Sequence, residues 1–241
     1  MVKKAEKENA MLPLDVARDI TLKSARRAFT YHTRRITGAD WLAYFQNITH
    51  QVIQEGGQRE QIFESDSALL ELVNAVLTGV DGYGDLASKE WKLSLPVKHR
   101  LAVGIALRSV GTAQAKDTAP SLCDLVEARL DATWPTGGKT LLYSGLVHRF
   151  RQPSIADLKR FNFESSRVKV VGTAGDGITI YPARQAIAMK IYDDLIESVD
   201  GYSIDGKPLE GAEAIKREMD GAHKAAAALD IFLGNDDVTI Q

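Results

Sequence analysis

The chain of 241 residues carries 30 basic and 32 acidic side chains, so its net charge is −2 and no global attraction for nucleic acid is expected. The single cysteine, Cys123, excludes an intrachain disulfide framework and a zinc site built from several cysteines. No apolar run approaches the ~20 residues that span a bilayer, so we expect no membrane segment. Residues 1–11, which are rich in Lys and Glu, predict a charged leader.

The tetrapeptide Val-Asp-Gly-Tyr occurs twice, at residues 80–83 and 199–202. Each copy closes an amphipathic helical pattern, in which apolar residues recur every three or four positions. The pair predicts an internal duplication. We therefore expect a first repeat over residues 12–111, a linker over 112–121 and a second repeat over 122–241.

The first half begins with two alternating segments, 14–22 and 28–34, which predict a β-hairpin that turns at 23–26. Thr37 stands three residues before Asp40, which is a capping-box start for a helix. That helix is expected to end at Gly56-Gly57, and its predicted apolar face consists of Trp41, Tyr44, Phe45, Ile48 and Val52. A second helix over 65–77, a turn over 81–85 and a third helix from Pro96 to Val110 complete the half.

The second half repeats this order. Residues 126–134 and 141–151 predict a hairpin around the turn 135–139, and Ser154 stands three residues before Asp157 as a second helix start. Five further elements follow: a hairpin of 167–171 and 178–181 around the 172–177 turn, a helix from Pro182 to Val199, a turn at 204–207, and two helices over 212–219 and 222–233. The hairpin after Ser165 has no predicted counterpart in the first half.

Matching residues keep a nearly constant spacing between the halves. Asp157 follows Asp40 by 117 positions, Asp200 follows Asp81 by 119, and His223 follows His99 by 124. Loop insertions account for such drift. The predicted fold class is α+β with two tandem duplicated repeats, each a β-hairpin followed by about three helices, the second with an extra hairpin.

Two glycine-containing segments resemble phosphate or dinucleotide loops, but hairpin turns explain both better. Gly138-Lys139-Thr140 ends like a phosphate-binding loop, yet Thr133 stands where the motif needs glycine and a strand pattern follows. The glycines at 172, 175 and 177 lack the G-x-G-x-x-G spacing and lie between β-branched runs. We expect no cofactor.

The histidines and the repeated aspartates suggest structural roles. The five histidines have no metal-like spacing, so no metal site is expected. His99 and His223 each precede a basic residue, and such a pair could cap a helix, contact a partner or act as a general base; no Ser, Cys or carboxylate motif supports the last. Asp81 and Asp200 are interpreted as turn residues, with the following Tyr packed back on the domain. We therefore expect no enzyme and no catalytic residue.

Basic side chains lie on or beside the predicted hairpins and could meet an acidic partner, although a solvated face is the simpler interpretation. Together with the two repeated histidines they form the candidate partner-binding set: Arg34, Arg35, Arg149, Arg151, His99 and His223.

A hairpin that leads into Phe-Arg-Gln-Pro-Ser-Ile-Ala-Asp at 150–157 is joined by Tyr-Asp-Asp-Leu-Ile at 192–196, the Val-Asp-Gly-Tyr turn and the closing His223-Lys224 helix. This combination resembles the tail assembly chaperones and related tail or virion-associated proteins of tailed bacteriophages. It covers residues 130–233 most clearly, with a weaker copy over 14–110. The resemblance implies a non-enzymatic protein that binds a tail tube or tape measure protein, in the host cytoplasm during assembly or in the virion.

Three other interpretations stay open. The chain could be a structural component of the particle, such as a tail or head/connector subunit that self-assembles into a ring or lattice. It could be an enzyme with an unrecognised site, which would need converging polar groups in a pocket. A nucleic-acid-binding module would require Arg34 and Arg151 to cluster on one face.

Overall fold

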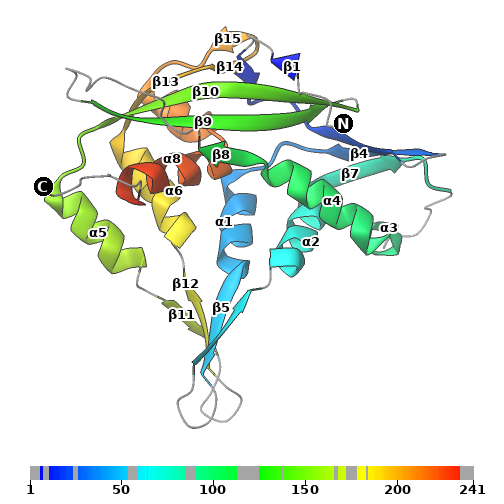
Figure 1. Cartoon of the computed structure of the whole chain (residues 1–241), viewed down its shortest axis with the longest axis horizontal. Helices are drawn as coiled ribbons and strands as arrows, with labels where there is room; N and C mark the ends of the chain where they lie inside the picture. The colour runs from blue at the N-terminus through cyan, green and yellow to red at the C-terminus, as the bar shows by residue number, and fades with distance from the viewer. Residues whose placement is uncertain are drawn as a thin grey trace, which may run out of the picture.

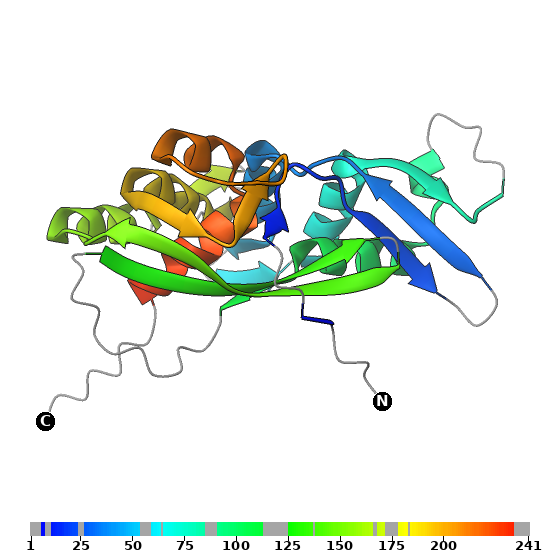
Figure 2. The same cartoon turned by 90° about the horizontal axis from the view of Figure 1, so that it is seen from above.

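The computed structural model describes residues 6–7, 11–23, 27–53, 59–63, 65–84, 91–112, 125–136, 138–165, 168–171, 178–182 and 184–233. The fold is α+β, as predicted: these residues form eight helices and fifteen strands. A long hairpin of β9 (Leu125–Thr136) and β10 (Lys139–Arg151) crosses the molecule, and the helices lie beneath it in Figure 1. Figure 2 shows the same hairpin running along one side.

The first half contains a three-stranded antiparallel sheet in the order β3-β4-β7. Its strands are β3 (Asp19–Lys23), β4 (Ala28–Thr33) and β7 (Leu77–Asp81). Its helices are α1 (Gly38–Asn47), α2 (Ser65–Val76), α3 (Trp91–Ser94) and α4 (Val97–Arg108). Helix α2 runs directly into β7, which returns to pair with β4.

The second half is built around β10, which pairs with β9, with β1 (Glu6–Lys7) and with β13 (Ile196–Asp200); β8 (Val110–Thr112) pairs with β9. Its helices are α5 (Ile155–Ser165), α6 (Arg184–Leu195), α7 (Ala212–Glu218) and α8 (Gly221–Leu233). A small sheet joins β15 (Lys207–Pro208), β14 (Tyr202–Ile204) and β2 (Leu12–Pro13).

A four-stranded antiparallel sheet in the order β11-β12-β5-β6 connects the halves at the end of the molecule opposite the long hairpin (Figure 1). Its strands are β5 (Thr49–Ile53), β6 (Arg59–Phe63), β11 (Val168–Val171) and β12 (Ile178–Pro182). The central pairing is between β5 and β12, which come from different halves. Each half therefore supplies one hairpin to a shared sheet.

The buried apolar residues form two clusters that follow the halves, with an exchange between them. The first cluster lies around Tyr31, Trp41 and Val73 but includes Ala222 and Ala225 of α8. The second lies around Phe150, Tyr192 and Tyr202, with Leu12 and Leu14 from the start of the chain. Segments assigned to one repeat from the sequence therefore complete the core of the other.

Most predicted elements are confirmed. The 65–77 helix forms as α2, and its predicted stripe of Leu69, Leu72, Val73, Val76 and Leu77 is buried. The hairpin of 126–134 and 141–151 forms, as do the helices from Pro96 and over 212–219 and 222–233. Both Asp-Gly-Tyr turns contain a glycine with positive φ, Gly82 at 90° and Gly201 at 88°.

The prediction that only the second half contains the additional hairpin is wrong. The first helix ends at Asn47 rather than continuing through Val52, and residues 49–53 form β5, which pairs with β6. The β-branched residues Thr49, Val52 and Ile53 favour a strand, and the strand partner is distant in sequence. Each half thus has four helices and an inserted hairpin, not three helices with an extra hairpin in one.

Other boundaries also differ. The helix predicted to reach Val199 ends at Leu195, and β13 follows it, as β7 follows α2. In each case a hairpin strand, β10 for β13 and β4 for β7, provides the backbone pairing partner. The predicted 14–22 strand is reduced to β3, and α3 was not predicted. Outside the described residues lie most of the 1–11 leader and of the 112–121 linker, Cys123, the helix stop at 56–57, the hairpin tip at 24–26 and the 172–177 turn.

Candidate functional site

Two of the candidate arginines brace a helix N-terminus. Arg34 donates to both carboxylate oxygens of Asp40, at 2.7 and 2.9 Å, while Asp40 accepts from the Thr37 backbone N–H and so completes a capping box. Arg151 holds Asp157 in the same way, at 2.8 and 3.1 Å. The arginine contacts lower the pKa of Asp40 to about 2 and hold the pKa of Asp157 well below its usual value.

In each half, a basic side chain on a strand with two neighbours lies between two carboxylates. His32 on β4 lies between two carboxylates, 3.2 Å from Asp19 and 2.9 Å from Asp81. Arg149 on β10 occupies the same position, 2.9 Å from Glu127 and 2.6 Å from Asp200. Each of these two side chains contacts carboxylates of both neighbouring strands. Asp81 and Asp200 are therefore ion-pair partners of the adjacent strand.

The two repeated histidines each bond to a tyrosine hydroxyl. His99 Nδ1 is 2.5 Å from the Tyr83 hydroxyl, and His223 Nδ1 is 2.9 Å from the Tyr202 hydroxyl. In the second half the chain of bonds continues, because His148 Nε2 is 2.7 Å from the Tyr202 hydroxyl and its Nδ1 is 2.8 Å from that of Tyr192. With both imidazoles neutral, both ring nitrogens of His148 and Nδ1 of His223 have a tyrosine hydroxyl as hydrogen-bond partner.

Burial sets the charge of this network. His148 is fully buried and His223 is 1% exposed, and desolvation lowers the pKa of His148 and lowers that of His223 to about 4. Both imidazoles are neutral near pH 7. Because His223 lies inside the core, its ring supports the fold of the second half rather than presenting a surface. His99 is half-buried and its ring packs 5.1 Å from Phe29.

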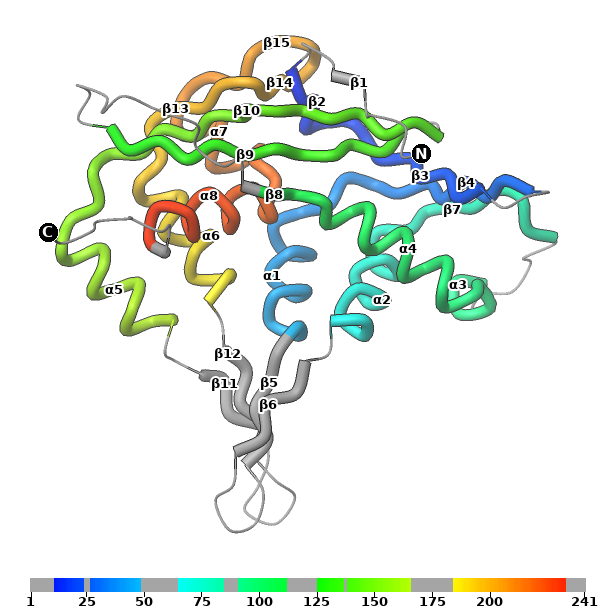
Figure 3. The backbone as a smooth tube through the Cα atoms, in the orientation of Figure 1, coloured from blue at the N-terminus to red at the C-terminus, as the bar shows by residue number. Residues whose placement is uncertain are grey.

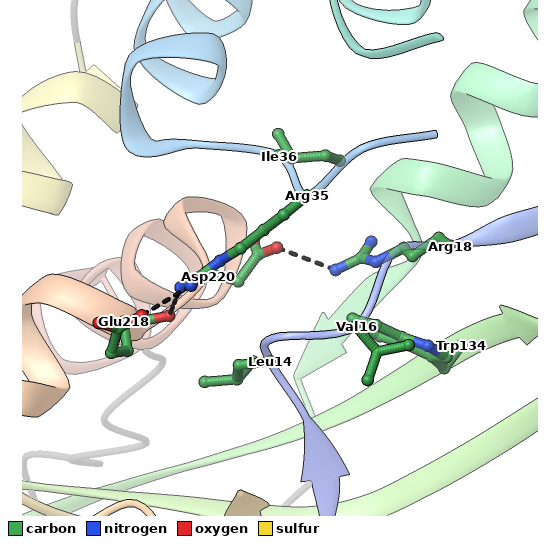
Figure 4. A pocket seen from close by; sticks show the side chains of 8 residues that line it. All are labelled: Leu14, Val16, Arg18, Arg35, Ile36, Trp134, Glu218 and Asp220. Carbon is green, nitrogen blue, oxygen red and sulfur yellow. Dashed lines mark hydrogen bonds and ion pairs between the residues drawn. The ribbon is translucent and has the colours of Figure 1, made fainter. Parts of the chain in front are cut away.

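Two further arginines join the halves around a small cavity, shown in Figure 4. Arg18, 6% exposed, donates to Asp220 at 2.9 Å and to the Leu107 carbonyl at 2.7 Å, and its guanidinium lies 3.9 Å from the Trp134 ring centroid. Arg35 donates to the carboxylate and backbone oxygens of Glu218, each at 2.6 Å. The cavity that they line has a volume of about 10 Å³, room for about one water molecule.

The candidate arginines are therefore all held by carboxylates of the same chain. They contact carboxylates at four separate places and do not form one basic face. Arg34 and Arg151 bind at two helix starts, Arg149 binds across neighbouring strands of a sheet, and Arg35 binds between the halves. Reading the sequence missed Arg18 and Asp220. The only available signal was a pair of opposite charges more than 200 positions apart, which no local pattern connects.

Helix α1 is the centre of the contact between the halves, where it lies among α2, α6 and α8 (Figure 3). Trp41 is fully buried, and a Cβ placed on Gly221 would lie 2.8 Å from its Cδ1 atom and 2.9 Å from Met189 Cε. The absence of a side chain at position 221 thus lets α8 approach α1. The hydrophobic contact and the β5·β12 pairing form one continuous interface between the halves.

Exposed apolar side chains gather on two helical regions at opposite ends of the molecule (Figure 1). On α5, Ile155 is 74% and Leu158 43% exposed. On α3 and α4, Leu93 is 61%, Val97 50% and Ile105 59% exposed. Several exposed apolar side chains on one element are a feature of surfaces that bind other proteins.

Within the described part of the chain, no group of three or more His, Cys, Asp or Glu side chains is arranged to hold a metal ion. The Gly138-Lys139-Thr140 segment forms a hairpin turn, as predicted, with Thr136 opposite Lys139 and Gly138 at a φ of 79°. No helix among the described residues is long and apolar enough to cross a bilayer.

Comparisons with protein-family models, with curated proteins and with solved structures gave no match.

Proposed function

We propose that the chain is a non-enzymatic bacteriophage morphogenesis protein, similar to a tail assembly chaperone, which acts by binding other proteins through two duplicated units. The family comes from the resemblance around residues 150–157 and 192–202. Its partners are proposed to be a tail tube or tape measure protein, in the host cytoplasm during assembly.

Contacts that recur at fixed spacing support the duplication. The Arg34–Asp40 and Arg151–Asp157 pairs lie 117 positions apart, and so do the His32 and Arg149 clamps. Helix α2 and strand β7 match α6 and β13 at a spacing of 119 residues. Asn74 accepts from Arg100 as Asp193 accepts from Lys224; the two acceptors lie 119 positions apart and the two donors 124.

The observation that carries the binding function is the exposed apolar surface on α5. Leu158 stands 117 positions after Trp41, the residue that α1 buries against the other half. The duplication thus places an apolar side chain at a docking position, and in the second unit that side chain remains 43% exposed. Burial of one such side chain contributes roughly 1.5–3 kcal/mol, so a partner that covers α5 gains affinity there.

A second candidate role is that of a structural subunit of the tail or of the head/connector. The observation that favours it is the position of the two apolar surfaces, on α5 and on α3–α4, at opposite ends of the molecule (Figure 1). A subunit with two such ends can be joined on both sides, which suits a particle component better than a single-partner chaperone.

The proposal is tested by mass spectrometry of particles and assembly intermediates from cells infected with the phage that encodes the chain. A chaperone is expected in tail intermediates and not in finished particles, whereas a structural subunit is expected in both. Disruption of the gene should stop particle formation at the tail or connector stage. Normal particles after disruption, with no peptide of the chain in any assembly fraction, would contradict both roles.

A further inference from the structure

The contact between the two halves joins elements that are not equivalent to each other. The first half contributes β5 and α1, and the second contributes β12 and the α6–α8 surface. Under the proposed duplication β12 corresponds to β6, because both run for five residues and begin 119 positions apart. Strand β11, with four residues, begins 119 positions after the five-residue β5 and corresponds to it. An interface of this kind is heterologous, and it leaves each unit with one unused side.

The unused sides are complementary. In the described part of the sheet, β6 and β11 are the outer strands and each pairs on one side only. The free edge of β6 corresponds to the edge of β12 that pairs with β5. The free edge of β11 corresponds to the edge of β5 that pairs with β12. Unpaired strand edges carry backbone N–H and C=O groups that can accept another strand.

The helices repeat this relationship. Leu158 on α5 corresponds to Trp41 on α1, and Val97 at the start of α4 corresponds to Gly221 at the start of α8. Within the chain, Trp41 packs on Gly221 and Met189. The counterparts Leu158 and Val97 are 43% and 50% exposed. Leu70, the counterpart of Met189 at a spacing of 119 positions, is half-buried.

We propose that the chain self-associates head to tail, with β11 and α5 of one copy docking on β6 and the α2–α4 surface of the next. The occupant of each apolar end is thus a second copy of the same chain, as in the structural-subunit role proposed above and not in the role of a single-partner chaperone. Repetition of the interface closes into a ring or continues as a filament, according to the rotation between units. This inference rests on the duplication proposed above.

The internal pairing specifies the register of the contact. Val52 lies opposite Thr179, and Gln51 lies opposite Ile180. Moving each residue to its counterpart 119 positions away predicts that Glu60 of one copy lies opposite Val171 of the next. Opposed Cα atoms in antiparallel strands are ~4.5–5.5 Å apart, a separation that a disulfide can bridge.

Cysteine cross-linking tests this register in the full chain with Cys123→Ser as background. Mixing a Glu60→Cys protein with a Val171→Cys protein should give a disulfide-linked dimer, and each protein alone should give little. The doubly substituted protein should give a ladder on a non-reducing gel. A pair shifted by three residues, Glu60→Cys with Val168→Cys, displaces the thiols by roughly 10 Å and should not cross-link efficiently.

An internal control separates the possible failures. Val52→Cys with Thr179→Cys should cross-link within one chain, because these residues are already paired. If that bond forms and the Glu60–Val171 bond does not, head-to-tail association is wrong, while the morphogenesis role is decided independently by the particle experiment. If neither bond forms, the shared sheet and the inference drawn from it both fail.

Light scattering over a range of concentrations supplies the second measurement. The unsubstituted protein should give multiples of 26.4 kDa. Leu158→Glu or Val97→Glu should weaken association about tenfold or more, because each buries a charge in an apolar contact. Val16→Glu, at a 45% exposed apolar position that borders the cavity between the halves but lies outside the proposed contact between copies, should leave the mass unchanged. A folded protein that stays monomeric at every concentration would overturn the inference.

Discussion

Trp41 and Gly221 are in contact across the boundary between the two halves, and a Cβ at position 221 would be 2.8 Å from Trp41 Cδ1. Gly221 is the first residue of α8, a position at which helix geometry does not itself require glycine. The reason for glycine there is the approach of α1. This one contact couples the hydrophobic core of the first half to the last helix of the second.

Gly221→Ala should therefore destabilise the protein by about 1–3 kcal/mol, as overpacking usually does, despite the better helix propensity of alanine. Gly38 is the matched control: it is the first residue of α1, and a Cβ there meets only Met189 Cε at 4.0 Å. Gly38→Ala should leave the free energy of unfolding unchanged or raise it. Urea unfolding of both variants checks this, and equal effects would contradict the close contact.

Loss of the buried Arg18 charge should be severe. Arg18→Met leaves Asp220 without its ion partner at 8% exposure, and removing one member of a buried pair costs about 3–5 kcal/mol. Combining it with Asp220→Asn should restore part of the loss, although the helix start at Ala222 also depends on Asp220. The control is Arg160→Ala, which breaks an ion pair of exposed side chains and should cost less than about 1 kcal/mol. Thermal unfolding distinguishes the two.

The stability of the second half should decrease as the pH falls from about 6.5 to about 4. Burial holds the pKa of His223 at about 4, below the value of ~6.5 expected in the unfolded chain, and lowers that of His148 in the same direction. The unfolded state therefore binds more protons in this window, and acidification favours it. The pKa of His32 is raised by Asp81 and Asp19, so its contribution to stability is complete below about pH 6.5 and is lost as the pH rises above that value.

Urea midpoints measured between pH 7.5 and 4 check the direction. His223→Gln removes one titrating ring, so the difference in unfolding free energy between the variant and the unsubstituted protein should change by a few kcal/mol over the window. NMR titration should show the His32 ring protonating above pH 6.5 and the His148 and His223 rings still neutral at pH 6. Protonation of His223 near pH 6.5 would refute the buried network.

The two helix caps should contribute equally. Thr37→Ala and Ser154→Ala each remove a hydroxyl that accepts from a backbone N–H, at 3.3 and 3.2 Å, and each should cost ~1 kcal/mol. Ser65→Ala serves as the control, because the one hydrogen bond of its hydroxyl to a described residue is a 3.5 Å contact with the neighbouring Asp66. A large difference between the two cap variants would weaken the proposed equivalence of the units.

The sequence by itself determined the features that depend on neighbouring residues. The Thr37 and Ser154 starts, the α2 stripe and the β9–β10 hairpin could be predicted, because capping, helical periodicity and turn chemistry act over a few positions. The spacing between the Asp-Gly-Tyr copies is the basis of the proposed duplication. Of the predicted partner-binding arginines, Arg149 and Arg151 lie on β10 and Arg34 and Arg35 directly follow β4, but their carboxylate partners were not identified from the sequence.

Only the tertiary structure decided where local preference ends and distant pairing begins. Residues 49–53 and 196–200 continue helical patterns, yet form strands because β12 and β10 supply backbone partners for them. The burial of Arg18 against Asp220 and Trp134 likewise depends on segments that meet only in the folded chain. An apolar stripe at helical spacing predicts that one face of the helix is buried. Which residues cover that face depends on packing between elements that are distant in sequence, and local sequence does not encode this packing.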